Sequence, residues 1–432
     1  MKRFGAWLRR RAGGKAEARR STSAPRRPEV SAPSAVVGPA DALLTGVVVA
    51  LVAFGVVMVY SASAVYANQH FDDGQHYLVR QGSYALLGLF VMVAAARVDY
   101  HRYRALTYPM LAGAVGLLLV VTLGLGHSAG GATRWIQLGP VNIQPAEVAK
   151  LALIAWLAYS LSKKREQIRS FSVGFLPHVL VAGLLMILCL KQPDFGSAVM
   201  IGLLTFVLLF AAGAKTGYLL AATLLAAPIA YALVTTSAYR MRRVQAFLDP
   251  FAHRYDVGYQ ISESLMSFGS GGVTGVGIGD SRQKLFFLPE AHTDFISAII
   301  GEELGFVGVC ILVLGFVILV VRGLKIAFQA ADDYGTYLAV GITMFVGLQA
   351  FTNLAVAMGM LPTKGLVLPF ISYGGSSLLV NCAAVGVLLN VSRPRAGTVP
   401  EDGVKDAGAT AHTSKDPDAP RVHGRALEGG TT

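Results

Sequence analysis

The chain has 432 residues, of which 54% are hydrophobic and only 14% are charged. This composition excludes an ordinary soluble protein, because apolar runs of about 18 or more residues, each able to span a bilayer as a helix, recur from Leu43 to Leu389. With 37 Lys and Arg against 25 Asp and Glu, the formal net charge is +12. No nucleic-acid-binding motif accompanies this charge, so we predict an all-α polytopic membrane protein that does not bind nucleic acid.

Both ends of the chain are predicted to be disordered tails. In residues 1–41, Arg9-Arg10-Arg11, Arg19-Arg20 and Arg26-Arg27 are separated by Ser, Ala, Pro and Gly. Two interpretations of this basic segment remain open: a solvated tail that fixes the orientation in the membrane, or an arm for anionic lipid or a cytoplasmic partner. Residues 393–432 form the second predicted tail.

Ten transmembrane helices are predicted between residues 42 and 392. The expected ranges are 42–62, 82–97, 105–125, 144–162, 172–190, 194–213, 217–236, 294–321, 335–358 and 372–391. Lys and Arg cluster after the second, fourth, eighth and tenth spans, on the same side as the basic N-terminal tail. Both termini are therefore predicted to be cytoplasmic, and a large extracytoplasmic loop at about 237–293 lies between helices 7 and 8.

Polar residues first gather before and within the fourth span. Arg134 can bind a phosphate through two N–H groups and Trp135 can stack on a sugar, although an interfacial Trp beside a snorkelling Arg is equally ordinary. Glu147 and Lys150 follow in the first turn of the span, where their three-residue spacing puts both charges on one face. They either line a wet cavity or form a structural ion pair.

The loop 237–293 breaks the charge rule, because Arg240, Arg242 and Arg243 are basic on its non-cytoplasmic side. This cluster binds either lipid headgroups or an anionic substrate such as a diphosphate. The glycine-rich segment 269–279 is not a nucleotide loop, since no Gly-Lys-Ser/Thr follows it. A flexible loop and an anion-binding loop remain open for it.

Asp294 is the strongest catalytic candidate. It ends the polar string Leu288-Pro289-Glu290-Ala291-His292-Thr293-Asp294, which runs directly into the eighth span, where a charge is costly. A general base, a metal ligand and a helix cap are its alternative roles. Glu302 and Glu303 follow about two turns deeper, and two adjacent carboxylates there need either a raised pKa or a basic partner, for which Lys150 is a candidate.

These strings together resemble the SEDS family (shape, elongation, division and sporulation) over about residues 42–392. The quoted matches are Gln144-Pro145-Ala146-Glu147 with Lys150, Lys191-Gln192-Pro193-Asp194-Phe195-Gly196, Gly258-Tyr259-Gln260, the run from Ser281 through Gly305, Leu361-Pro362-Thr363-Lys364-Gly365 and Ile371-Ser372-Tyr373-Gly374-Gly375-Ser376-Ser377. The form of Gln283-Lys284 and the Asp294 string is closer to the division member of the family than to the elongation member.

The resemblance implies a ten-helix glycosyltransferase of the cytoplasmic membrane, which polymerises lipid II into peptidoglycan strands at the division septum. Its implied partners are lipid II, the nascent glycan strand, a class B penicillin-binding protein that acts as the transpeptidase, and other division membrane proteins. The family's essential aspartate matches Asp294. The candidate cavity residues are Arg134, Trp135, Glu147, Lys150, Arg243, Gln283, Lys284, His292, Lys364 and Ser372.

The expected chemistry needs a base near the acceptor hydroxyl and positive charge near the leaving diphosphate. We assign the base to Asp294 and expect inversion, because a single displacement forms no covalent sugar intermediate. A divalent cation, Mg or Mn, is a candidate for sharing the positive charge, and no organic cofactor is expected. Two alternative functions remain: a lipid II flippase and a scaffold that only recruits division proteins.

Overall fold

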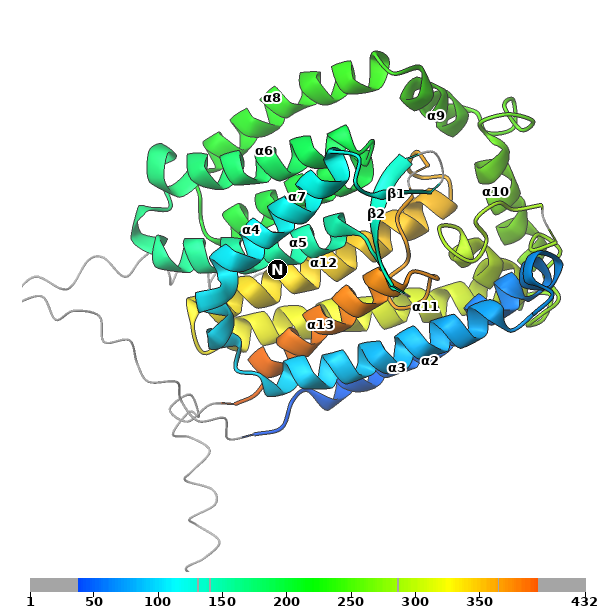
Figure 1. Ribbon diagram of the computed structural model, residues 1–432, viewed down its shortest axis with the longest axis horizontal. Helices are drawn as coiled ribbons and strands as arrows, with labels where there is room; N and C mark the ends of the chain where they lie inside the picture. Colours follow the sequence, from blue (N-terminus) through cyan, green and yellow to red (C-terminus); the bar gives the residue numbers. More distant parts are fainter. Residues whose placement is uncertain (1–37, 130–131, 140, 286, 364, 395–432) are drawn as a thin grey trace, which may run out of the picture. The chain divides into compact units, whose positions relative to one another are not determined.

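The computed structural model describes residues 38–394, except for 130–131, 140, 286 and 364 (Figure 1). Nearly all of the two predicted tails, and the candidate Lys364, therefore lie outside the described residues. The helices are α2 (Ala42–Phe71), α3 (His76–Arg97), α4 (Tyr103–Thr122), α5 (Pro145–Lys163), α6 (Leu176–Lys191), α7 (Phe195–Ala211), α8 (Thr216–Thr235), α9 (Ala238–Leu248), α10 (Tyr259–Gly271), α11 (Ile296–Gln329), α12 (Asp333–Ala357) and α13 (Gly375–Val391).

Each predicted span coincides with one of these helices. Counted with the short turns that precede α4 and α6, seven described helices are long and apolar enough to cross a membrane, and α7 and α13 are shorter apolar helices. The helix α5, which coincides with the predicted fourth span, is in neither group. The chain is therefore a helical, multi-pass membrane protein. The first span was predicted to end at residue 62, but α2 continues to Phe71. Hydropathy marks the apolar part of a helix, whereas its hydrogen bonds continue through the polar turns that follow.

The centre of the bundle is α12, whose residues are mostly buried. It packs against α11, α5, α7 and α13, while α3 packs against α13 and α2, and α2 packs against α11. Glycine allows close approach: a Cβ at Gly341 would lie 2.4 Å from Ile154 Cγ2, and one at Gly386 would lie 2.3 Å from the Met92 carbonyl oxygen. In contrast, α8 contacts α7 and α9, and Leu219 is its buried residue.

The segment predicted as a large loop contains the helices α9 and α10, and its glycine-rich part is a packing element. Gly305 has φ of 63° and interrupts α11. At this interruption the amides of Val276 and Gly277 donate to the carbonyls of Glu302 and Glu303 at 3.0 Å each, and the Phe306 amide donates to Gly272 at 2.9 Å. Glycine is required here because a Cβ at Gly275 would lie 2.1 Å from the Glu303 oxygen.

The predicted loop between α4 and α5 forms a small antiparallel sheet, which the all-α prediction did not include. Its strands are β1 (His127–Ala129), β2 (Ala132–Leu138) and β3 (Val141–Ile143). β2 pairs with both neighbours, with His127 opposite Trp135 and Gln137 opposite Asn142. This sheet leads directly into the first turn of α5.

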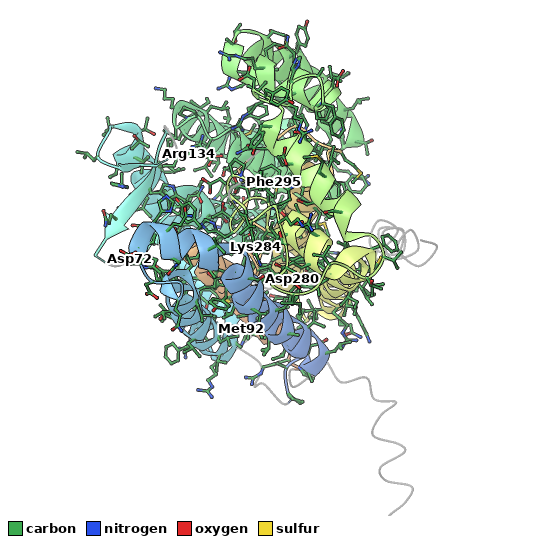
Figure 2. All side chains as sticks on the ribbon, turned by 90° about the vertical axis from the view of Figure 1, so that its right-hand side faces the viewer. Asp72, Met92, Arg134, Asp280, Lys284 and Phe295 are labelled. Carbon is green, nitrogen blue, oxygen red and sulfur yellow. The ribbon has the colours of Figure 1, made fainter. Side chains whose placement is uncertain are left out.

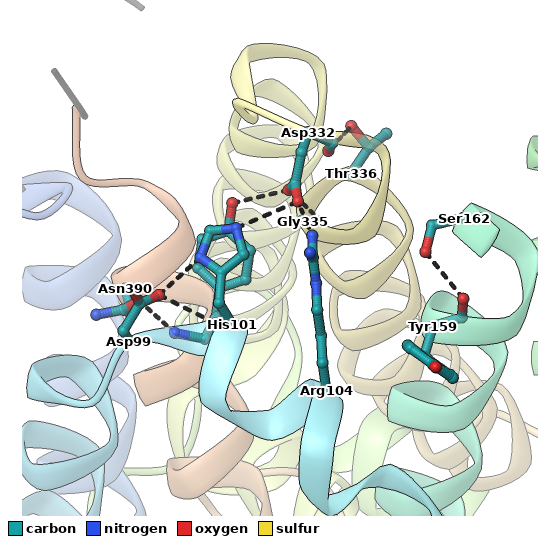
Figure 3. Close-up of polar contacts among 10 residues, drawn as sticks. Asp99, His101, Arg104, Tyr159, Ser162, Asp332, Gly335, Thr336 and Asn390 are labelled. Atoms are coloured by element: carbon teal, nitrogen blue, oxygen red, sulfur yellow. Dashed lines mark hydrogen bonds and ion pairs between the residues drawn. The ribbon is translucent and has the colours of Figure 1, made fainter. Parts of the chain in front are cut away.

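One end of the bundle, which we call the Asp332 end, is joined by a polar network (Figure 3). Asp332 accepts hydrogen bonds from the Tyr100 hydroxyl at 2.8 Å and the Gly335 amide at 2.9 Å, and it pairs with His101 and Arg104. Burial opposes ionisation, but these hydrogen bonds and the Arg104 charge lower the pKa of Asp332 to about 2.

The first and last described helices also meet at the Asp332 end. The Asp41 amide, just before α2, donates to the Ser392 hydroxyl just after α13 at 3.0 Å. Asp41 also pairs with Arg322 of α11 at 2.5 Å. The described part of the chain therefore begins and ends on the same side of the bundle.

Candidate active site

Asp294 lies at the opposite end of the bundle, in a turn immediately before α11. The amides of Thr293 and Phe295 both donate to the Glu290 carbonyl, at 3.1 and 3.2 Å, and Glu290 itself has φ of 56°. The helix begins at Ile296, and Asp294 does not cap it. The helix-cap alternative is therefore wrong, and the side chain is available for another role.

Asn353, near the end of α12, fixes this turn through two hydrogen bonds. Its side-chain amide donates to the Asp294 carbonyl at 2.8 Å and to the Leu366 carbonyl at 2.6 Å. It thereby holds the turn against the loop that follows α12, where a Cβ at Gly365 would lie 3.2 Å from Asp294 Oδ2. Neither Asn353 nor the role of Gly365 was predicted from the sequence. A polar Asn at the end of an apolar span was the available signal.

The Asp294 carboxylate is partly buried and accepts no hydrogen bond from the residues that the structure describes. Burial raises the pKa of Asp294 to about 7, and the nearby Glu290 charge adds to this effect. Arg243 and Arg134 act in the opposite direction. A carboxylate with this pKa is partly ionised at neutral pH and remains basic enough to accept a proton.

The two arginines that act on Asp294 are held by backbone carbonyls. Arg134, on β2, donates to the carbonyls of Gln192 and Pro193 at 3.1 and 2.6 Å, and no carboxylate pairs with it in the described ranges. Arg243, on α9, donates to the Thr363 carbonyl at 3.0 Å. Carbonyls orient a guanidinium without neutralising it, so Arg134 retains the charge that an anionic ligand needs. Figure 2 views the structure from this end, where Arg134 and Phe295 are labelled.

Glu147 and Lys150 form a buried ion pair within α5. The carboxylate and ammonium are 2.6 Å apart, and their side chains are 2% and 0% exposed. Lys150 also lies 5.3 Å from the centre of the Phe345 ring. Glu147 Oε2 is buried without a hydrogen-bond partner among the described residues. The three-residue spacing is confirmed as an ion pair, while a cavity role for it stays a prediction.

Lys284, and not Lys150, pairs with one of the two adjacent carboxylates of α11, that of Glu303. Lys284 Nζ lies 3.0 Å from Glu303 and 3.4 Å from the Ser61 hydroxyl of α2, and Ser61 donates to Glu303 at 2.7 Å. Glu302 instead accepts hydrogen bonds from the Ser281 hydroxyl and the Arg282 amide. These contacts attach the segment before Asp294 to α2 and α11.

The four remaining candidates occupy different positions. The backbone N–H of Gln283 donates to the Glu302 carboxylate at 3.4 Å, and the Gln283 side-chain oxygen has no partner within the described part of the chain. Ser372 is buried and accepts the Leu368 amide at 2.8 Å, which closes the loop before α13. His292 lies beside Tyr77, with ring centres 4.7 Å apart, and Trp135 is partly exposed on β2.

The fold and this site together define a multi-pass helical membrane protein with a partly buried aspartate, whose pKa two arginines lower, at one end of its bundle. The FtsW/RodA/SpoVE family, described as cell cycle proteins, matches residues 41–396, and the chain belongs to this family. This confirms the SEDS resemblance.

Similar proteins agree with this assignment. A relative from Geobacter sulfurreducens, named "Probable peptidoglycan glycosyltransferase FtsW", is 49% identical over 82% of this chain and 95% of its own length. Stage V sporulation protein E of Bacillus subtilis is 42% identical over 82% of this chain and 97% of its own length.

Two solved structures also resemble the chain. One is described as "Structural coordination of polymerization and crosslinking by a peptidoglycan synthase complex", with 30% identity, a TM-score of 0.69 and coverage of 82% of this chain and 97% of the other. The other is the rod shape determining protein RodA of Thermus thermophilus, with 29% identity, a TM-score of 0.62 and coverage of 83% and 98%.

Proposed function

We propose that this chain is a peptidoglycan glycosyltransferase that polymerises lipid II during septal cell-wall synthesis, with Asp294 as its base. The observation that carries the proposal is the Asp294 carboxylate, which accepts no hydrogen bond from the described residues and has a pKa raised by burial to about 7. The names of the relatives, and the division-like form of the Asp294 string, support this activity and the septal location.

In the proposed reaction, Asp294 accepts the proton of the acceptor hydroxyl while that oxygen attacks the anomeric carbon of the donor sugar. The bond from that carbon to the diphosphate oxygen breaks, and the electron pair leaves with the diphosphate. Arg134 and Arg243 stabilise the negative charge that develops there. A single displacement of this kind inverts the anomeric centre.

The Asp294 end of the bundle is proposed to be extracytoplasmic, with ten spans and both termini in the cytoplasm. Arg104, Arg165 and Arg322 form ion pairs at the opposite end, where α2 begins and α13 ends. Short-loop cations favour the cytoplasmic side. An even number of spans then returns the chain to the side on which it starts.

A class B penicillin-binding protein is the proposed transpeptidase partner, together with other division membrane proteins. The similarity to a chain of a peptidoglycan synthase complex supports the first. Phe306, Ile311 and Val317 on α11 are half or more exposed, which fits lipid or a partner helix in the membrane.

A divalent cation is proposed to arrive with the substrate. No group of three His, Cys, Asp or Glu side chains that could hold a metal occurs in the described ranges. Asp294 can supply one oxygen ligand to an ion held by a diphosphate. Such an ion would add positive charge beside the leaving group.

Purified Asp294→Asn protein, given lipid II together with the partner transpeptidase, tests the proposal. It should fold and form no glycan polymer, because an amide cannot accept the proton. Asp256→Asn is the matched control, since Asp256 is an exposed carboxylate in the same segment between α8 and α11. Comparable polymer from the wild type and Asp294→Asn would contradict the assigned role.

The flippase alternative has one observation in its favour, the buried Glu147–Lys150 pair, because intramembrane charges often mark transport paths. Vesicles with labelled lipid II distinguish the two activities. Polymer without translocation supports the enzyme, and translocation without polymer supports the flippase. A scaffold predicts that variants at Asp294, Glu147 and Lys150 still complement division.

A further inference from the structure

Four aromatic rings converge at the turn that carries Asp294, and we call them the ring cluster: Tyr66, Tyr77, His292 and Tyr373. The His292 ring centre lies 4.7 Å from that of Tyr77, 5.7 Å from that of Tyr66 and 5.8 Å from that of Tyr373. Tyr77 and Tyr373 meet edge to face at 4.9 Å. The rings come from α2, α3, the turn before α11 and the loop before α13, so the fold brings together four separate segments.

The ring cluster is attached to the same turn that carries Asp294. His292 precedes Asp294 by two residues, and the Tyr373 amide donates to the His292 carbonyl at 2.9 Å. The turn is closed by the hydrogen bond from the Phe295 amide to the Glu290 carbonyl at 3.2 Å. Any group bound on these rings is therefore held at a fixed position relative to the carboxylate.

All four rings are partly exposed, which differs from the buried Tyr100 and Tyr334 at the Asp332 end. Partly exposed tyrosines present an apolar face and a polar hydroxyl together, which suits the faces and hydroxyls of a sugar. Tyrosines are also common at membrane interfaces. A converging cluster on four segments, however, concentrates ring faces at one place, whereas an interfacial belt spreads them around the bundle.

The two arginines that act on Asp294 and the ring cluster differ in chemistry. Arg134 and Arg243 act on the carboxylate electrostatically and suit the diphosphate of the donor. The ring cluster offers ring faces and hydroxyl groups, which suit a carbohydrate. The base must touch the sugar whose hydroxyl it deprotonates, and that sugar belongs to the acceptor.

We propose that the ring cluster is the binding subsite for the acceptor sugar of the glycosyl transfer. The subsite rests on the proposed function for its reaction. It orients the acceptor hydroxyl toward Asp294, and Tyr66, Tyr77 and Tyr373 act by contact with the sugar rather than by proton transfer.

The test compares ring removal with ring retention. Tyr77→Leu and Tyr373→Leu should raise KM for lipid II about tenfold while kcat changes less than about threefold, since a lost ring contact of about 1.4 kcal/mol weakens binding tenfold. Tyr77→Phe and Tyr373→Phe keep the ring and should stay within about twofold of the wild-type KM. Tyr60→Leu is the matched control, because Tyr60 is an exposed tyrosine on α2 outside the ring cluster.

A second readout does not depend on polymerisation. Saturation-transfer NMR with the soluble disaccharide-pentapeptide, which lacks the lipid and the diphosphate, should show transfer to sugar protons in the wild type and in Asp294→Asn. The transfer should be lost in Tyr77→Leu and kept in Tyr60→Leu.

Different results refute the acceptor-sugar subsite and the proposed glycosyltransferase function. An unchanged KM together with unchanged saturation transfer in the leucine variants refutes the subsite, as does a fall in Tm and kcat at constant KM, which indicates packing alone. Wild-type protein that makes no polymer refutes the proposed function instead. In that case the NMR experiment still decides whether the ring cluster binds a sugar.

Discussion

Replacing Lys284 separates a structural role from a substrate-binding role. The Glu303 side chain is 0% exposed and that of Lys284 is 7% exposed, with 3.0 Å between their charged atoms. Lys284→Met leaves the Glu303 carboxylate buried without its basic partner, while the Ser61 hydroxyl still donates a hydrogen bond to it. Removing one partner of a buried pair costs about 3–5 kcal/mol in the free energy of unfolding.

The double variant Lys284→Met/Glu303→Gln provides the second arm. It removes both charges, so its free energy of unfolding should recover to within about 1 kcal/mol of the wild type, because a buried pair is close to neutral against an uncharged replacement. The free energy of unfolding is measured by titration with sodium dodecyl sulfate in mixed micelles, with loss of helical circular dichroism as the signal.

Lys191→Met is the matched control, since Lys191 is exposed at the end of α6. It should change the free energy of unfolding by less than about 0.5 kcal/mol. The structural role of Lys284 is refuted if the Lys284→Met protein is as stable as the wild type yet cannot polymerise lipid II. That result would place Lys284 on the substrate, as the sequence analysis predicted.

Three further predictions follow from the site and the fold. The rate of polymerisation should fall about tenfold per pH unit below about pH 7, where Asp294 becomes protonated. Arg243→Gln should move this acidic limb of the pH–rate profile to higher pH, because it removes a charge that lowers the Asp294 pKa. A flat pH–rate profile would exclude Asp294 as the base. Gly305→Ala should abolish correct folding, because the new Cβ would lie 2.3 Å from the Gly275 nitrogen and residue 305 has φ of 63°. The measurement is loss of monodisperse protein in size-exclusion chromatography. Gly46→Ala is the control and should be tolerated, because its Cβ would meet no atom within 4 Å. The ionised Asp332 stabilises the fold above pH 3.8, the usual pKa of an aspartate, because its own pKa is lowered to about 2. This contribution of up to about 2 kcal/mol to the free energy of unfolding is lost as the pH falls toward 2. Asp332→Asn should therefore lose less stability over that pH range in the detergent titration.

Local pattern predicts the helices well because an apolar run of sufficient length has few alternatives in a membrane. It also placed Asp294 within two residues of the start of α11, since a polar string that meets an apolar run marks a boundary. The Glu147–Lys150 pair followed from helical spacing alone.

Contacts between distant segments could not be predicted in the same way. Lys284 and Ser61 are 223 positions apart, and their meeting depends on how α2 packs against α11. The clamp of Asn353 on the Asp294 carbonyl likewise spans 59 positions. The glycine-rich segment looked like a flexible or anion-binding loop, because its packing on the interrupted α11 is visible only when both partners are placed together.

The two buried ion pairs differ in when they can form during biogenesis. Glu147 and Lys150 lie one turn apart on α5, so this pair can form as soon as α5 itself has formed. Lys284 and Glu303 lie on opposite sides of the Asp294 turn, and they join only after that turn has closed against α2. An unpaired Glu303 would therefore mark nascent chains in which the Asp294 turn has not yet closed.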